Sequence, residues 1–434
     1  MRIFATVAIF VFVYFFIATE KINKTIIAVI GASLMLCLKL VTFEQAIASV
    51  DFNVIFLLVG MMTSVSILSK TGFFEWAATS IAKQSRGNPI LIMILLMLVT
   101  AVFSAVLDNV TTIILLVPVT ILIAQILEVS PIPFVIMEAI ASNVGGTSTL
   151  IGDPPNIVIG SQAGLSFNEF ITNLGPVVLV VLACLSVTSY FVFRNRLKVS
   201  DHVKKRVLDA IPTLAIVDKK NMIKSLIILG LMLVAFSLHS ITHLEPGIVA
   251  LGGSMVLMLL CKTKTDHALM EVEWGVIFFF IGLFMMISAM EHNGVIRWLG
   301  QEALKLGGNN LFLMCVIILW GSAIFSSVLD NIPFVITMVP LIKYCIPMMA
   351  HTAGVTDAAM IHTTIAEPMW WSLALGACLG GNGTLIGASA NVVMSHICER
   401  NKYPVSFMLF SKYGIGFMVQ SMIICTIYIW LRYF

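Results

Sequence analysis

Two aspartate-asparagine pairs, Asp108-Asn109 and Asp330-Asn331, are the groups in this sequence best suited to chemistry. Each pair follows a long apolar run that carries no other charge. A carboxylate in a membrane-spanning stretch costs roughly 2.5 to 3.5 kcal/mol on insertion scales, and a capping serine or threonine would avoid most of that cost. Asparagine offers one acceptor and two donors, and aspartate can take up a proton where charge is disfavoured. The pairs therefore predict a site that exchanges a proton with a ligand, while helix capping stays open as an alternative.

A second pair of motifs, GGTSTLIGDPPN and GGNGTLIGASAN, interrupts two other apolar stretches. Glycines permit unwound backbone, which membrane proteins tolerate only against protein or a water-filled cavity. The exposed carbonyl, hydroxyl and amide groups would then bind a ligand. Packing of neighbouring helices against Gly145 and Gly380 is an equally good interpretation. The residues predicted to bind substrate, in both kinds of motif, are Asp108, Asn109, Thr111, Gly146, Thr147, Ser148, Thr149, Asn156, Asp330, Asn331, Asn382, Gly383, Thr384 and Asn391.

The two glycine motifs differ in one chemically important position. Asp153 is interpreted as an N-cap because Pro154 follows it at the first helical position. The second motif has Ala388 there, so the two half-sites are unequal. Asn156 and Asn391 occur in both motifs and are either ligand groups or helix-end caps. The predicted proton-coupling residues are Asp108, Asp330 and Glu138.

Membrane-spanning helices must hold these motifs. Of the 434 residues, 59% are hydrophobic and 11% are charged, which leaves too little polar surface for a soluble globule. The apolar runs are continuous, unlike the alternating strands of a membrane barrel. The eight cysteines form no C-x-x-C pattern, so neither a disulfide framework nor a metal site is predicted. Spans are expected at 4–18, 25–41, 53–69, 171–193, 222–239, 247–261, 274–290 and 409–431, the first as a spanning helix and not as a cleaved signal peptide.

The two halves of the chain repeat each other. Residues 103–118 and 325–340 are identical at nine of sixteen positions with an offset of 222, and residues 145–160 and 380–395 at eight of sixteen with an offset of 235. We predict an all-α polytopic membrane protein with two inverted repeats, 1–193 and 222–434, joined by a basic linker, 194–221. Each repeat would have about five transmembrane helices, one re-entrant hairpin and one discontinuous helix, the arrangement of many secondary transporters. If 89–123 and 310–342 each crossed the membrane twice, the number of crossings in each repeat would still be odd, so full crossings stay an alternative.

Positive charge predicts the orientation. The stretch 194–224 holds nine of the 25 Lys and Arg residues, which places the central loop in the cytoplasm of an integral plasma (inner) membrane protein. With that orientation 19 of the basic residues are cytoplasmic, six are outside, and both termini are outside. A helix over 73–86 is expected in the cytoplasmic interface, where it would support the hairpin that follows.

Both Asp-Asn motifs, both GG-x-x-TLIG breaks and the basic linker resemble the ion transporter superfamily over nearly the whole chain. This superfamily includes ArsB-type arsenite/antimonite efflux permeases, the pigmentation P protein, NhaD-type sodium/proton antiporters and dicarboxylate/citrate carriers. LDNVTTIILLVPVT and GGTSTLIGDPPN look closest to the branch of the P protein and the ArsB type. The resemblance implies a scaffold and a transport domain, elevator-like movement, commonly a homodimer, and substrate residues at the hairpin tips and in the unwound linkers.

The preferred prediction is a proton-coupled antiporter that exports arsenite or antimonite without a cofactor. The alternatives are a sodium/proton antiporter and a P-protein-like anion or dicarboxylate transporter. The tip aspartates disfavour the second of these because they would repel an anion. The chain has no HExxH or GxSxG motif, so an enzyme is disfavoured. It also has no Walker A motif, so any use of ATP would need a separate ATPase subunit. The expected partners are the small ion and the lipid bilayer, and the net charge of +3 is no argument for nucleic acid.

Overall fold

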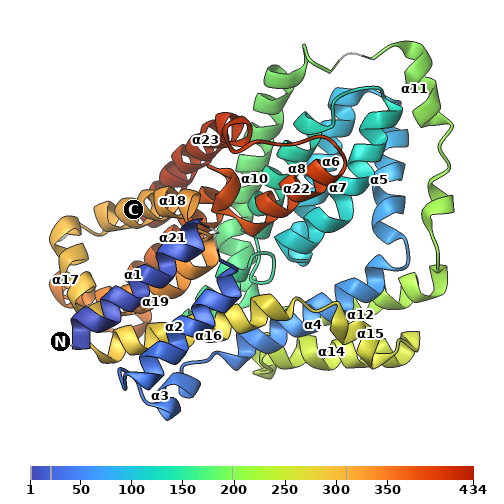
Figure 1. Cartoon of the computed structure of the whole chain (residues 1–434). Coiled ribbons are helices and arrows are strands. Elements are labelled where there is room, and N and C mark those ends of the chain that lie inside the picture. The colour runs from blue at the N-terminus through green and yellow to red at the C-terminus, as the bar shows by residue number, and fades with distance from the viewer. Residues whose placement is uncertain (1, 20–21, 198, 309) are drawn as a thin grey trace.

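The computed structural model describes residues 2–19, 22–197, 199–308 and 310–434, which form helices and no β-strand (Figure 1). Within these ranges nine helices are long and apolar enough to cross a membrane. The all-α polytopic fold is confirmed. The nine helices are α4 (Phe52–Ser69), α6 (Pro89–Val106), α7 (Asn109–Ile126), α10 (Phe167–Phe193), α12 (Lys219–Ser237), α16 (Trp274–His292), α18 (Leu311–Val328), α19 (Asn331–Ala353) and α23 (Phe407–Tyr433).

Shorter helices complete the two repeats. The apolar ones among them are α1 (Arg2–Thr19), α2 (Lys24–Cys37), α8 (Ile132–Gly146), α14 (Pro246–Cys261) and α21 (Glu367–Gly380). The second arms of the discontinuous helices are α9 (Pro154–Ala163) and α22 (Ser389–Arg400). The remaining helical segments are α3 (Phe43–Ala48), α5 (Phe73–Gln84), α11 (Asp201–Leu208), α13 (His239–Thr242), α15 (Thr265–Met270), α17 (Val295–Gly307), α20 (Ala358–Ile361) and the short turns Pro212–Ala215, His362–Ala366 and Leu385–Gly387.

The helix bounds follow the sequence repeat. Helices α2, α4, α5, α6 and α7 begin 222 residues before α14, α16, α17, α18 and α19, and α8 and α9 begin 235 residues before α21 and α22. Contacts between the halves are exchanged in the same way: α4 packs on α14 while α16 packs on α2, and α7 packs on α22 while α19 packs on α9. Such exchanged pairs are what a twofold relation between the repeats requires.

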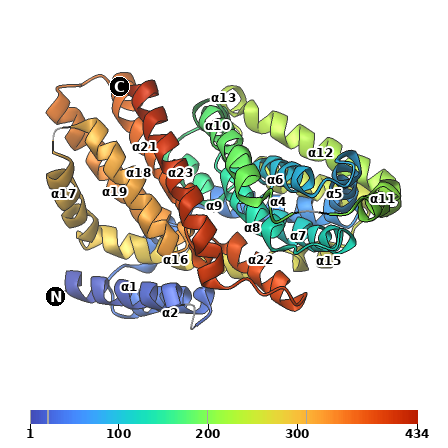
Figure 2. The same cartoon turned by 90° about the horizontal axis from the view of Figure 1, so that it is seen from above.

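The two hairpins lie far apart on either side of the centre in both views (Figures 1 and 2). Helices α5, α6 and α7 lie at one end of the molecule, and α17, α18 and α19 lie at the other, so the hairpins approach the centre from opposite sides (Figures 1 and 2). The predicted boundaries of the repeats stay a prediction, with α12 beginning at Lys219 inside the predicted linker. Lys21 and Lys198, which the predicted orientation counts as cytoplasmic, lie outside the described residues.

Both Asp-Asn segments are helical hairpins. Leu107 and Asp108 join α6 to α7, and Leu329 and Asp330 join α18 to α19. The two tips meet inside the protein, where both aspartates line one cavity. Each of the four arms is long and apolar enough to span a membrane, so re-entrant hairpins at 89–123 and 310–342 stay a prediction. The predicted helix at 73–86 is α5, and it packs on α6 and α7 as expected of a hairpin support.

Close helix crossings explain the first glycine of each break. Gly145 and Gly380 lie within α8 and α21, and a β-carbon would come within 2.1 Å of the Ala101 carbonyl oxygen at Gly145 and 2.6 Å of the Ala323 carbonyl oxygen at Gly380. The packing interpretation therefore holds for these two glycines. The unwound segments begin after them.

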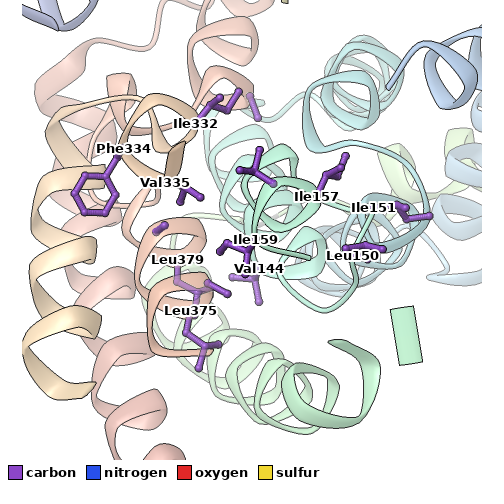
Figure 3. Close-up of a cluster of buried hydrophobic side chains, with 14 of the residues drawn as sticks. Val144, Leu150, Ile151, Ile157, Ile159, Ile332, Phe334, Val335, Leu375 and Leu379 are labelled. Carbon is purple, nitrogen blue, oxygen red and sulfur yellow. The ribbon is translucent and has the colours of Figure 1, made fainter. Parts of the chain in front are cut away.

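Apolar side chains from both repeats surround the breaks (Figure 3). Val144 and Ile159 of the first repeat and Val335, Leu375 and Leu379 of the second are fully buried in one continuous core. Since lipid chains are as apolar as these side chains, tight packing and polar contacts must hold the two halves together. The shell thereby isolates a polar centre from lipid.

Candidate functional site

A cavity of about 370 Å³ lies between the two hairpin tips. Asp108 and Asp330, the two aspartates singled out from the sequence, both line it. The other polar side chains of its wall are Asn23, Lys24, Glu273, Ser389 and His396. The structure therefore brings the two motif carboxylates together around one space.

Asp330 is paired with a lysine that the sequence analysis had used only for orientation. Lys24 Nζ, at the start of α2, lies 2.6 Å from Asp330 Oδ2, and the Ser389 hydroxyl donates to the same oxygen at 2.8 Å. The other carboxylate oxygen accepts the Ile332 N–H at 3.3 Å and so caps α19. Capping and a charged contact in the cavity coexist here. The repeat position of Lys24 is Pro246, so the first hairpin has no such cation.

Asp108 is held differently. Its carboxylate accepts the Thr111 N–H at 2.8 Å and the Thr111 hydroxyl, and it forms no ion pair within the described part of the chain. Asp108 therefore caps α7 and still faces the cavity as an unpaired carboxylate. Thr111, predicted to bind substrate, lies at this tip as a partner of Asp108.

Asp153 lies behind the tips and does not cap its helix by its side chain. The side chain is fully buried and makes no capping bond: Pro154 and Pro155 have no N–H group, and the Asn156 N–H donates to the Asp153 backbone carbonyl at 2.9 Å. It accepts Asn109 Nδ2 at 3.2 Å, and Asn331 Nδ2 lies 3.3 and 3.2 Å from its two oxygens. Asp153 does occupy the N-cap position of α9, and the helix begins at Pro154 as predicted, but the carboxylate makes no capping bond. One carboxylate instead touches the asparagine of each hairpin.

Asn143 was missed by the sequence analysis. It is fully buried in α8, donates to Asn382 Oδ1 at 2.8 Å and to Asn391 Oδ1 at 3.2 Å, and accepts from Asn109 Nδ2 at 3.2 Å. Its repeat position, Cys378, lies 3.4 Å from Asn156 Oδ1. A lone asparagine in an apolar half-helix, two residues before Gly145, was the available signal.

The predicted asparagines of the breaks hold the unwound backbone. Asn156 Nδ2 donates to the carbonyls of Gly146, Thr147 and Thr149 at 3.3, 3.1 and 2.9 Å. Asn391 Nδ2 does the same in the second repeat, at 2.8 Å to the carbonyl of Gly381 and at 3.1 Å to that of Thr384. In this conformation the amides are engaged within the protein.

Hydroxyl groups of the breaks bind the hairpins. Thr149 donates to the Ala105 carbonyl at 2.5 Å, and Thr384 donates to the Ser327 carbonyl. Each break is thus fixed to the tip of its own hairpin. The remaining predicted residues of the breaks, which lie beside this network and not on the cavity wall, are Thr147, Ser148, Asn382 and Gly383.

Glu138 is not brought to the tips. It is fully buried in α8, where Thr120 donates to its Oε1 at 2.6 Å and its Oε2 has no partner among the described residues. It does not line the cavity. Its predicted part in proton coupling stays a prediction.

A second, smaller cavity is lined in part by the repeat equivalents of outer residues of the first. It measures about 100 Å³. Five of its residues occupy the repeat positions of residues in the large cavity: His239, Glu245, Pro246, Ile157 and Ser161 correspond to Ile17, Asn23, Lys24, Val392 and His396. By contrast, the central pairs Asp108 and Asp330, Val110 and Ile332, and Pro154 and Ser389 all belong to the large cavity. The central residues therefore line only the large cavity, and the small cavity is formed by repeat equivalents of its outer residues.

The N-termini of four helices meet at the large cavity. Asp108 and Asp330 precede α7 and α19, Pro154 and Ser389 begin α9 and α22, and all four residues line the wall. Helix N-termini carry partial positive charge, which favours oxygen-rich groups. The wall thus combines carboxylates with positive helix ends.

Inverted repeats, paired hairpins, discontinuous helices and a central cavity between them define a membrane protein with the architecture of a secondary transporter. A family model described as citrate transporter matches residues 14–376. The chain belongs to this family, CitMHS.

Relatives with similar sequences cover the whole chain. A 46 kDa membrane protein of Mycobacterium leprae is 39% identical over 98% of both chains, and an uncharacterized transporter of Mycobacterium tuberculosis is 41% identical over 99% of this chain and 98% of its own length. The human P protein is 31% identical over 97% of this chain, which spans 58% of that protein. The resemblance to the ion transporter superfamily is confirmed, and the chain is a transporter and not an enzyme.

A solved structure supports the fold. The YdaH transporter of Alcanivorax borkumensis, described as having an unusual topology, matches with a TM-score of 0.59 over 87% of this chain and 85% of that one. The sequence identity is 13%, so this likeness concerns the fold alone.

Proposed function

We propose that this transporter is proton-coupled and works by alternating access, as an elevator. The observation that carries the proposal is the pair of cavities: one set of residues lines the large cavity around the central aspartates, and the repeat equivalents of its outer members line a small, separate cavity. Exchange of conformation between the repeats would close the large cavity and open the small one. In an elevator the hairpins and discontinuous helices would move together against the other spanning helices.

The large cavity is proposed to face the cytoplasm. The basic linker precedes α12, and the small cavity includes His239, just beyond the far end of that helix. Helix α14 packs on α12 and leads the chain back to the side of the linker. Glu273, which lines the large cavity, follows on that side and immediately precedes α16. The large cavity therefore opens on the side of the linker, which positive charge assigns to the cytoplasm of the plasma (inner) membrane.

Arsenite or antimonite, moved outward against protons, is the first proposed substrate. Trivalent arsenic at neutral pH is largely an uncharged triol, which hydroxyl, amide and carboxylate groups can hydrogen-bond without a thiolate cage. The cavity wall offers such groups at Asp108, Asp330, Ser389 and Asn23. An uncharged solute also avoids repulsion by the wall carboxylates.

Citrate is a second candidate, favoured by the description of the family and by the positive groups of the wall. Lys24 and the four helix N-termini would attract carboxylate oxygens. Three carboxylates, those of Asp108, Glu273 and Asp330, oppose a polyanion. Citrate would therefore have to enter with its charge reduced by protons or by a bound cation.

Flux into proteoliposomes under an imposed pH gradient tests the function. We expect the gradient to drive uptake of arsenite and antimonite at least tenfold faster than a matched vesicle without a gradient, and collapse of the gradient by a protonophore should remove the difference. The same vesicles should be tested with citrate, succinate and sodium, so that the alternatives are compared directly. Equal uptake with and without the gradient for every solute would refute proton-coupled transport.

Alternating access predicts opposite labelling of two repeat-equivalent positions. Ser161→Cys and His396→Cys lie in the small and the large cavity, and both should be made in a chain with the exposed Cys37 and the partly exposed Cys184 and Cys261 replaced by serine. An impermeant thiol reagent should label His396→Cys from the linker side at least tenfold faster than Ser161→Cys from the other side. During turnover the first rate should fall and the second should rise. Rates that move together would contradict the exchange of conformations.

A further inference from the structure

The carboxyl group that joins the two hairpins is Asp153, and it belongs to only one repeat. Its side chain is fully buried, and its oxygens face the amide groups of Asn109 and Asn331 at 3.2 to 3.3 Å. The repeat position is Ala388. A single carboxylate therefore lies at the meeting point of two mirror-related halves, directly behind the residues that line the cavity.

No cation neutralises Asp153 within the described residues. The titratable groups around it are Asp330 before α19, Asp108 before α7 and the Cys378 thiol on α21. Helix α4, which also packs on α9, contributes no titratable side chain. A buried carboxylate that meets only amide donors and a thiol, close to two further carboxylates, has a strong physical reason to bind a proton.

We propose that Asp153 carries the coupling proton, whereas Asp108 and Asp330 contact the transported solute. This inference rests on the proposed proton-coupled function and assigns its proton to one residue. The proton site and the solute site are then neighbours. In each hairpin the aspartate contacts the solute, and the asparagine that follows it, Asn109 or Asn331, contacts Asp153. The sequence-based prediction gives both tasks to Asp108 and Asp330, and gives proton coupling to Glu138 as well.

The hydrogen bonds give the proton a mechanical consequence. As a carboxylate, Asp153 accepts from the asparagine of both hairpins. Binding of a proton at Oδ2 forms an O–H bond there and removes the negative charge that Asn331 Nδ2 faces at 3.2 Å. The neutral acid still accepts hydrogen bonds, but more weakly than the carboxylate, so the bonds from Asn331 and from Asn109 both weaken. Asn331 is then held less tightly, and the next residue is Asp330, which pairs with Lys24.

Infrared spectroscopy tests the proton site without knowledge of the solute. Difference spectra of the full chain in lipid, recorded between pH values, should contain the C=O stretch of a buried protonated carboxyl group. Asp153→Asn, which keeps the shape of the side chain, should abolish this band. Asp108→Asn and Asp330→Asn should retain it. A band that survives Asp153→Asn, a band lost in a tip variant instead, or a wild type without any titrating carboxyl band would overturn the proposal.

A second variant keeps the test valid if Asp153→Asn does not fold. Asn331→Ala removes one donor and leaves Asp153 in place, so the carboxylate form loses a hydrogen bond and the band should titrate about one pH unit higher. A merely structural network would weaken thermal stability without shifting this midpoint. An unchanged midpoint in Asn331→Ala therefore counts against the proposal.

Flux separates this inference from the proposed function. In vesicles loaded with arsenite or citrate, Asp153→Asn should lose pH-driven accumulation at least tenfold while it retains downhill exchange of the solute that the wild type carries. Intact pH-driven accumulation in Asp153→Asn would refute the role of Asp153 and leave the proposed function standing. A titrating band assigned to Asp153 in a wild type without pH-driven flux would refute the proposed function and support Asp153 as a proton site.

Discussion

Replacement of Asp330 by asparagine should lower solute flux roughly 30-fold, and replacement of Lys24 by methionine in the same chain should recover part of the loss. Asparagine keeps the shape of Asp330 but removes the charge that Lys24 Nζ contacts at 2.6 Å. A hydrogen bond between charged groups contributes about 2 kcal/mol, and 1.4 kcal/mol is a factor of ten. The single variant also leaves the Lys24 ammonium beside the cavity without its carboxylate. The double variant removes both charges.

The comparison that isolates the ion pair is a double-mutant cycle. Flux should be measured for the wild type, Asp330→Asn, Lys24→Met and the double variant, and the two single losses should not multiply in the double variant. Asp108→Asn is the matched control, because Asp108 has the same place in the first hairpin but no lysine partner. Addition of Lys24→Met to Asp108→Asn should recover nothing. If the two single losses multiply in the Asp330 double variant, the ion pair contributes nothing to transport.

The fold was predictable because the sequence contains it twice. Chance similarity between hydrophobic helices would not place two Asp-Asn pairs and two GG-x-x-TLIG motifs at matching positions. Charge and hydropathy then decided the spans, and the parity of the crossings decided the inversion. Whether the segments at 89–123 and 310–342 are hairpins could not be decided in this way, because hydropathy does not show where a chain turns back inside the membrane. That depends on the tertiary contacts of Asp108 and Asp330.

The site was predictable only where the residues recur in both repeats. Asp108 and Asp330 recur, and both line the cavity. Lys24 and Asp153 have no counterpart in the other repeat, so a comparison of the halves marks Asp153 only as a difference between the half-sites and does not mark Lys24 at all. Local sequence was misleading as well: a lysine at the end of a span suggests orientation, and an aspartate before prolines suggests a cap. Both side chains act across the interface between the repeats, which no local pattern reports.

Gly145→Ala should lower the thermal stability of the protein although it adds only one methyl group. A β-carbon at Gly145 would lie 2.1 Å from the Ala101 carbonyl oxygen and 2.5 Å from its Cα, both backbone atoms of α6 that no rotamer change can move. Overpacking of this kind costs roughly 1 to 3 kcal/mol and occasionally more. The helix that must shift is the first arm of the Asp108 hairpin. We therefore expect a clear fall in the apparent Tm of the purified protein, together with reduced flux.

Gly230→Ala is the control, and its expected change in Tm has the opposite sign. It lies in α12, and a β-carbon there would meet no atom within 4 Å. Alanine is favoured over glycine in a helix by up to about 1 kcal/mol, so this variant should raise Tm slightly. Gly380→Ala, against Ala323, should behave like Gly145→Ala because the repeat places the same crossing there. Equal shifts of Tm in all three variants would mean that backbone preference, and not the crossing of α6 with α8, decides the outcome.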